Sequence, residues 1–196
     1  RKNKKILNHI QSGLSEAEKL SNQGENEKAV SKYIEMLDYL VSKEGGIKDS
    51  QKVSQMFTKI GEGLHRVDEH RKAVESFEKA LNRKPDNLTP LLKKGVAYMG
   101  MEGMEQYALE CFEKVLKNDP TNEKALAHKA NVLRQVGRES KAMTAFRDLL
   151  DRDLSNASFI HKLVKQDPDD PNLWKLEGEY FKEAGKIEKA IKSYEK

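Results

Sequence analysis

Cysteine and long apolar runs are scarce in this sequence of 196 residues. The single cysteine, Cys111, excludes an internal disulfide bond. No apolar stretch is longer than four residues, whereas a membrane-spanning helix needs roughly 18. The basic residues in 1–5 are not followed by the apolar segment of a signal peptide. These absences predict that the chain is cytoplasmic and that it does not bind a membrane.

The sequence also lacks a clear excess of either charge, since 36 lysines and arginines stand against 32 aspartates and glutamates, for a net charge of +4. This small excess is spread along the chain, unlike the clustered basic face of a nucleic-acid-binding protein, so the charge argues against a nucleic acid as the partner. Hydrophobic residues make up only 37% of the chain, and its mean hydropathy is −0.82. Such a composition predicts an elongated structure in which each element contacts its neighbours in sequence.

Aromatic residues recur with an alanine four positions before each. The five pairs are Ala29 with Tyr33, Ala73 with Phe77, Ala108 with Phe112, Ala142 with Phe146, and Ala190 with Tyr194. A glycine stands five positions before four of these alanines, and Asp68 takes its place in the other copy. The second, third and fourth rings are 35 and 34 residues apart. This recurrence indicates an internal repeat of about 34 residues.

The repeat resembles the tetratricopeptide repeat, a helix-turn-helix unit with small residues, aromatic rings and a terminal proline at set positions. The copy at 171–196 matches most closely, with Trp174, Gly178, Phe181, Ala190 and Tyr194. The resemblance implies an all-α fold, a right-handed α-solenoid of antiparallel helix pairs. We expect a single solenoid domain over residues 1–196, with units at about 10–43, 54–87, 88–122, 123–156 and 171–196.

Two segments depart from the period. Around Gly45 and Gly46, between units one and two, we expect a longer second helix and a looser loop. Between units four and five, where Leu154 replaces the expected proline, an apolar stripe predicts one extra helix at about 156–166, capped by Ser155 or Asn156. The stripe consists of Phe159, Ile160, Leu163 and Val164. We hypothesise that this helix bends or offsets the solenoid. The sequence lacks an initial methionine and ends within a helix pair, so we expect a fragment of a longer protein.

The sequence contains no combination of residues typical of a catalytic site. The histidines have no zinc-binding spacing with a cysteine, and Cys111 beside Phe112 is better explained as a small apolar filler than as a nucleophile. No glycine-rich phosphate loop follows a strand, and the acidic run 167–170 is interpreted as a turn between helices. We therefore predict a protein that is not an enzyme and has no catalytic residues, metal or cofactor.

The resemblance implies a concave peptide groove on the first helices of successive units. The candidate residues are Thr58, Glu62 and His65 in unit two, Leu92, Val96 and Met99 in unit three, and Lys124, Ala127, Asn131 and Arg134 in unit four. The three apolar residues of unit three share one helix face and form either the floor of the groove or part of the core. Lys94 on the presumed buried side is compatible with both, because its stem can snorkel.

Some tetratricopeptide repeat proteins hold the acidic tail of heat-shock chaperones in a two-carboxylate clamp. Positions 58, 62, 93, 124 and 128 match only one of its five residues, and Glu62 would repel a carboxylate, so the clamp is disfavoured. The leading hypothesis is a non-catalytic scaffold that binds a peptide or helix of a partner protein in the groove. The alternatives are a structural module that self-associates and a nucleic-acid-binding helical repeat. The identity of the partner stays open.

Overall fold

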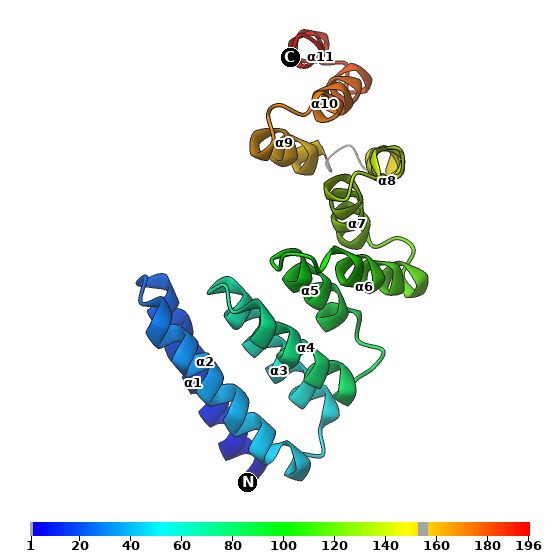
Figure 1. Ribbon diagram of the computed structural model, residues 1–196. Helices are drawn as coiled ribbons and strands as arrows, with labels where there is room; N and C mark the ends of the chain where they lie inside the picture. The colour runs from blue at the N-terminus through cyan, green and yellow to red at the C-terminus, as the bar shows by residue number, and fades with distance from the viewer. Residues whose placement is uncertain (1, 153–156) are drawn as a thin grey trace. The chain divides into compact units, whose positions relative to one another are not determined.

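The computed structural model describes residues 2–152 and 157–196. These residues form eleven α-helices and one 3₁₀ turn, and the described ranges contain no β-strand. Most of the helices are paired in sequence order (Figure 1), so the expected all-α fold of helix pairs with one extra helix is confirmed. Contacts divide the chain into two compact units, Arg1–Cys111 and Phe112–Lys196. The single domain and the repeat bounds given above stay predictions.

The first unit contains five complete helices. They are α1 (Lys2–Asn22), α2 (Asn26–Lys43), α3 (Ser50–Arg66), α4 (His70–Arg83) and α5 (Leu88–Met99). Helix α6 (Glu105–Asn118) passes from the first unit into the second. The second unit continues with α7 (Glu123–Gln135), α8 (Glu139–Arg152), α9 (Ala157–Gln166), α10 (Pro171–Glu183) and α11 (Ile187–Tyr194). Helix α1 packs on α2, α3 on α4, α7 on α8, and α10 on α11.

The turn inside each helix pair contains one residue in the left-handed region. At four turns this residue is a glycine with φ between 70° and 78°, which has no Cβ to oppose that conformation. The four glycines are Gly24, Gly103, Gly137 and Gly185. Between α3 and α4 the residue is Asp68, with φ at 64°. Aspartate enters this region more readily than most residues, so the fifth turn keeps the geometry of the other four.

Asparagine or aspartate side chains cap four of the helices. The caps are Asp49 before α3, Asn87 before α5, Asn122 before α7 and Asp170 before α10. Each side chain accepts a hydrogen bond from a backbone N–H in the first turn, which would otherwise have no acceptor within the helix. At Asp49 the bond from the Lys52 backbone N–H is the main cause of a lowered pKa.

The segment between α2 and α3 is attached to the helical core. Helix α2 is the longer second helix that we expected, with 18 residues against 14 in α4, and the 3₁₀ turn Glu44–Gly46 follows it. Ile47 is only 3% exposed, and Oε2 of Glu44 lies 2.9 Å from Nε of Arg83 on α4. The loop is therefore held more tightly than the looser loop we expected.

The extra helix of the second unit is α9. Its residues Ile160, Leu163 and Val164 are buried, as the apolar stripe predicted, and α9 contacts α10. The predicted caps Ser155 and Asn156, together with Leu154 and the side chain of Phe159, lie outside the described residues. Helix α10 also contacts α8, where Nε of Arg147 lies 3.3 Å from Oε2 of Glu179. The bend or offset at α9 stays a hypothesis.

Candidate functional site

Two adjoining depressions follow the surface between α1 and α3 in the first unit. One is lined by Gln11, Leu14, Ser15, Glu18, Tyr33, Lys59, Glu62, Gly63 and Arg66. The other is lined by Asn3, Lys4, Leu7, Asn8, Gln11, Ile47, Asp49, Lys52, Gln55 and Met56. Because both follow the same two helices and share Gln11, we treat them together as the α1–α3 groove. It offers apolar side chains, amides and charges to a partner.

Tyr33 of α2 reaches the wall of this groove because α3 has a glycine opposite it. A Cβ added at Gly63 would lie 2.2 Å from Cε1 of Tyr33, closer than any side chain permits. The ring is 2% exposed, and burial raises the pKa of Tyr33, an effect that Arg66 opposes and Glu18 adds to. The phenol therefore stays protonated at neutral pH and can donate or accept a hydrogen bond.

All three carboxylates that line the groove have a cationic partner. Nη1 of Arg66 lies 3.0 Å from Oε1 of Glu18, which joins α3 to α1. Nζ of Lys93 on α5 lies 3.1 Å from Oε1 of Glu62. At the other end, Nζ of Lys52 lies 3.1 Å from Oδ2 of Asp49. The negative charge that we expected to repel a carboxylate at Glu62 is thus offset by Lys93.

Two lysines of the groove are left without such a partner. Lys4 and Lys59 are exposed, and neither forms an ion pair with any residue in 2–152 or 157–196. Because the lining carboxylates are already paired, these two ammonium groups give the groove an excess of positive charge. The arrangement favours a ligand that carries negative charge.

The predicted site residues of α3 have different environments. Thr58 is 7% exposed, and its hydroxyl donates to the Ser54 carbonyl at 2.8 Å, so it faces the core and corrects its assignment to the peptide groove. Glu62 is half-buried and lines the groove. His65 is half-buried, with its Nδ1 3.0 Å from Nδ1 of His70. Burial, followed by the charge of His70, lowers the pKa of His65.

The apolar stripe of α5 consists of Leu92, Val96 and Met99, which are all half-buried. Two flanking lysines show how the helix is turned. Lys93 pairs with Glu62 on α3, whereas Nζ of Lys94 lies 2.7 Å from Oε1 of Glu78 on α4 and 5.6 Å from the centre of the Tyr98 ring. The Lys94 stem thus crosses partly buried surface, as snorkelling would require. The assignment of the stripe to the groove or the core stays a prediction.

The predicted residues of α7 belong to the second unit. Lys124 is exposed, but Ala127 is only 7% exposed, which corrects its assignment as a contact residue. Asn131 is half-buried, and its Oδ1 is buried without a hydrogen-bond partner among the described residues. His128 stacks on Phe112, with 5.4 Å between the ring centres.

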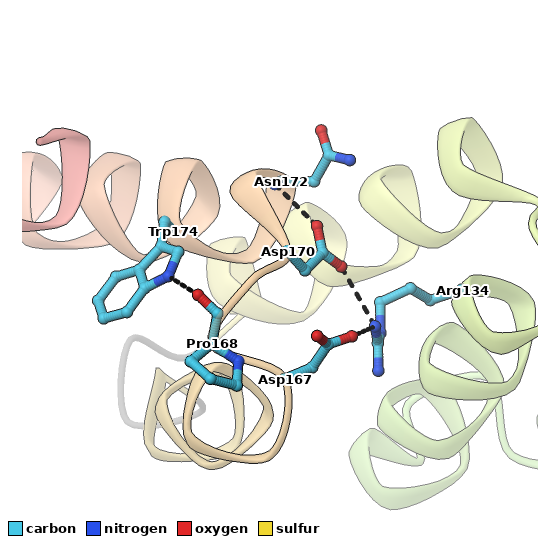
Figure 2. Close-up of polar contacts among 6 residues, drawn as sticks. All are labelled: Arg134, Asp167, Pro168, Asp170, Asn172 and Trp174. Carbon is cyan, nitrogen blue, oxygen red and sulfur yellow. Dashed lines mark hydrogen bonds and ion pairs between the residues drawn. The ribbon is translucent and has the colours of Figure 1, made fainter. Parts of the chain in front are cut away.

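Arg134 is held by two carboxylates of the acidic loop before α10 (Figure 2). Its Nη1 lies 2.8 Å from Oδ2 of Asp167 and 3.2 Å from Oδ2 of Asp170, and its side chain is 13% exposed. Asp170 also caps α10, and the indole N–H of Trp174 donates to the Pro168 carbonyl at 2.7 Å. The acidic run 167–170 lies between α9 and α10, so its interpretation as a turn between helices is confirmed. Its clustered carboxylates were the one feature of the sequence that could have predicted a cationic partner such as Arg134.

The candidate residues predicted from the sequence include none on α1, which forms one side of the α1–α3 groove. Gln11, Ser15 and Tyr33 were missed because the candidate groove was placed on units two to four. Leu14 and Glu18 could have indicated it, since both stand on the first helix of unit one. No set of three or more histidine, cysteine, aspartate or glutamate residues in 2–152 and 157–196 could hold a metal ion. Among these residues no helix is long and apolar enough to cross a membrane.

Comparison with known proteins places the repeat in a family. Residues 55–87 and 91–122 each match a sequence model described as a tetratricopeptide repeat. No curated protein matches the sequence. Among solved structures, MamA 41-end from Desulfovibrio magneticus RS-1 is 14% identical, with a TM-score of 0.57 over 95% of this chain and 91% of that one.

Two further solved structures show a similar fold. A tetratricopeptide repeat protein from Parabacteroides merdae is 16% identical, with a TM-score of 0.57 over 95% of this chain and 77% of that one. A second MamA structure is 16% identical, with a TM-score of 0.54 over 91% and 90% of the two chains. These likenesses establish the fold, and the two matched segments carry the family's sequence pattern. The chain thus contains two tetratricopeptide repeats within a fold similar to that of these structures.

Proposed function

We propose that this chain is a non-catalytic scaffold that binds an extended or helical segment of a partner protein in the α1–α3 groove. Tetratricopeptide repeats mediate protein–protein interactions. The observation that carries the proposal is the pairing of every lining carboxylate, which leaves Lys4 and Lys59 available to a ligand. We also propose that the half-buried stripe Leu92, Val96 and Met99 on α5 extends this surface, because Lys93 beside it pairs with Glu62 of the groove.

The groove lining indicates the chemistry of the partner segment. Amides of Asn8, Gln11 and Gln55 can each donate and accept hydrogen bonds, as peptide groups of an incoming chain require. Leu7 and Met56 offer apolar contact beside them. We infer a segment with apolar side chains and at least one carboxylate, which would meet Lys59 near the Tyr33 phenol. One carboxylate at this position does not require the two-carboxylate clamp.

A library of displayed peptides selected on the chain tests the proposal. Lys59→Glu reverses the charge of an exposed groove lysine, so selected peptides should bind it at least tenfold more weakly, a loss of about 1.4 kcal/mol. Lys19→Glu is the matched control, because it makes the same change at an exposed lysine of α1 outside the groove lining.

Three results of this selection are informative. Enrichment of acidic sequences, with binding lost in Lys59→Glu and kept in Lys19→Glu, would support the proposal. Equal binding by the two variants would place the ligand elsewhere on the surface. Failure of the selection to enrich any sequence would contradict peptide binding by this chain.

A second candidate function is self-association, and α11 carries the observation that favours it. Ile187, Ile191 and Tyr194 are spaced by four and three residues on one face of the helix, and each is about half exposed. An apolar face of this kind can associate with another apolar surface. Sedimentation over a wide concentration range tests this, since a strict monomer at high concentration would eliminate it.

A further inference from the structure

Two histidines face one another where α3 ends and α4 begins. His65 lies in the last turn of α3, and His70 is the first residue of α4. Their Nδ1 atoms are 3.0 Å apart, and their ring centres are 4.8 Å apart. On its other side the His70 ring lies against the end of α5, where a Cβ added at Gly100 would lie 2.4 Å from Nε2 of His70. The pair therefore joins the ends of three helices.

The contact between the two rings depends on their protonation. At 3.0 Å one Nδ1 must donate a hydrogen and the other must accept it, so at least one of the two atoms carries no proton. When both rings are imidazolium ions, both Nδ1 atoms carry hydrogens that point at each other. The hydrogen bond is then lost, and two positive charges repel at close range. The His70 ring is confined by Gly100, whereas His65 is half-buried and can turn toward solvent.

Charged groups from several elements surround this pair. Lys93 of α5 adds positive charge near His65, and Asp68 of the turn opposes it. Oδ1 of Asp68 lies 3.9 Å from Nε2 of His70. Other titratable or charged groups nearby are Glu62 and Arg66 on α3, Glu69 and Arg71 at the start of α4, and Glu102 after α5. Burial, followed by the charge of His70, lowers the pKa of His65, which is the direction that keeps the contact intact at neutral pH.

We propose that His65 and His70 form a proton-sensitive latch beside the α1–α3 groove. The latch is closed while one Nδ1 accepts from the other, and it opens when both rings carry two protons. Opening releases His65 as a cation next to Glu62 and Lys93, where it competes with Lys93 for the groove carboxylate. This regulation of binding rests on the proposed function, whereas the latch itself does not.

Histidine NMR on the whole chain tests the latch without a ligand. Long-range correlation of the ring nitrogens with ring protons at pH 7.5 reports which nitrogen carries the hydrogen in each neutral ring. The latch requires opposite tautomers, with hydrogen on Nδ1 of one ring and on Nε2 of the other. Two rings that both carry hydrogen only on Nε2 would overturn the proposal, because neither Nδ1 could then donate.

Titration of the same signals tests the response to acid. In the wild type, His65 should titrate below 6.5, the ordinary value for histidine, and amide signals of 67–69 and Gly100 should shift with it. His70→Gln keeps a hydrogen-bonding group opposite His65 but cannot become a cation, so the His65 midpoint should rise toward 6.5. His9→Gln is the matched control on exposed surface and should leave that midpoint unchanged. An identical His65 midpoint in wild type and His70→Gln would refute the latch.

The link to binding is measured separately. A peptide selected on the groove should bind the wild type more tightly at pH 5.5 than at pH 7.5. The difference should be larger in His70→Gln than in His9→Gln, because without the His70 cation His65 becomes charged at a higher pH. Equal differences in both variants would remove the regulatory role while the NMR result stands. If selection gives no peptide, the proposed function fails, and the tautomer and titration experiments still decide the latch.

Discussion

A Cβ built on Gly61 of α3 would lie 2.6 Å from Cε1 of Phe77 on α4, so the Phe77 ring occupies the space that a side chain at position 61 would need. The same relationship recurs in the last helix pair, where a Cβ on Gly178 would lie 2.5 Å from Cε1 of Tyr194. In both pairs the missing side chain lets an aromatic ring reach the backbone of the partner helix. This close contact explains why the repeat has a small residue at one position and an aromatic residue at the other.

Gly61→Ala should therefore destabilise the chain although alanine favours helices. Overpacking of this kind costs about 1–3 kcal/mol, of which roughly 1 kcal/mol is offset by the higher helix propensity of alanine. The free energy of unfolding in urea measures the net loss. Gly45→Ala is the control, because a Cβ there has no neighbour within 4 Å. Equal stability of the two variants would contradict the close packing.

Phe146→Ala should lower the free energy of unfolding by roughly 3–5 kcal/mol. Phe146 is fully buried in α8, so the substitution leaves a cavity that the surrounding helices cannot fill. Thermal and urea unfolding measure the effect. Tyr107→Ala serves as the comparison, since that ring is 53% exposed and should contribute much less. An unchanged melting curve for Phe146→Ala would refute the assigned repeat register.

Arg134→Ala should destabilise the second unit by about 1–3 kcal/mol, because hydrogen bonds to charged groups contribute that much when they are shielded from water. The substitution removes a cation that is 13% exposed and leaves the carboxylate of Asp170, which is 11% exposed, without it. Arg147→Ala is the matched control. Its pair with Glu179 is more exposed, so a loss of at most about 1 kcal/mol is expected.

Urea unfolding followed by Trp174 fluorescence distinguishes the two arginine variants, because the Trp174 indole of α10 donates to the Pro168 carbonyl in the loop that Arg134 holds. Similar losses in both would show that Arg134 acts as an ordinary surface cation. In that case Arg134 would be free to serve the predicted groove, and peptide binding by Arg134→Ala would test this.

The stability of the chain should decrease as the pH falls through the titration of His65. Burial, followed by the charge of His70, lowers the pKa of His65 in the folded chain, so the unfolded chain binds the proton more tightly. The resulting stabilisation is fully present above about pH 6.5, the ordinary value, and is lost as the pH drops through the folded value. His65→Asn should show a smaller decrease in urea midpoint between pH 7.5 and 5.5 than the wild type. Parallel decreases would contradict this assignment.

Much of the fold could be predicted because the residues that define the repeat are close together in the sequence. Within one helix pair, the aromatic ring lies four residues after an alanine, and the left-handed turn residue lies five residues before the same alanine. Both spacings can be read directly from the sequence. The one turn without a glycine also fits the pattern, since Asp68 has a positive φ like the glycines at the other four turns. The extra helix α9 was recognisable for the same reason, because its stripe repeats at helical spacing.

The candidate site was less predictable, because helical spacing does not give the rotation of one helix against its neighbour. Thr58 stood beside a buried stripe in the sequence, and the packing of α3 placed it inside. Lys93 and Lys94 are adjacent, yet one pairs with α3 and the other with α4. One residue changes direction by about 100° around a helix axis, so a small rotation decides between groove and core.

The sequence by itself determined an all-α repeat, its turns and its small-to-aromatic contacts, because these depend on neighbours along the chain. Only the tertiary structure decided which charges are paired. Glu18 finds Arg66 at a separation of 48 residues, and Arg134 finds Asp167 at 33. These pairs form because packing brings distant side chains within hydrogen-bond reach, and no local pattern specifies them. In the groove, the pairs of Glu18, Glu62 and Asp49 leave Lys4 and Lys59 without an ion pair among the described residues.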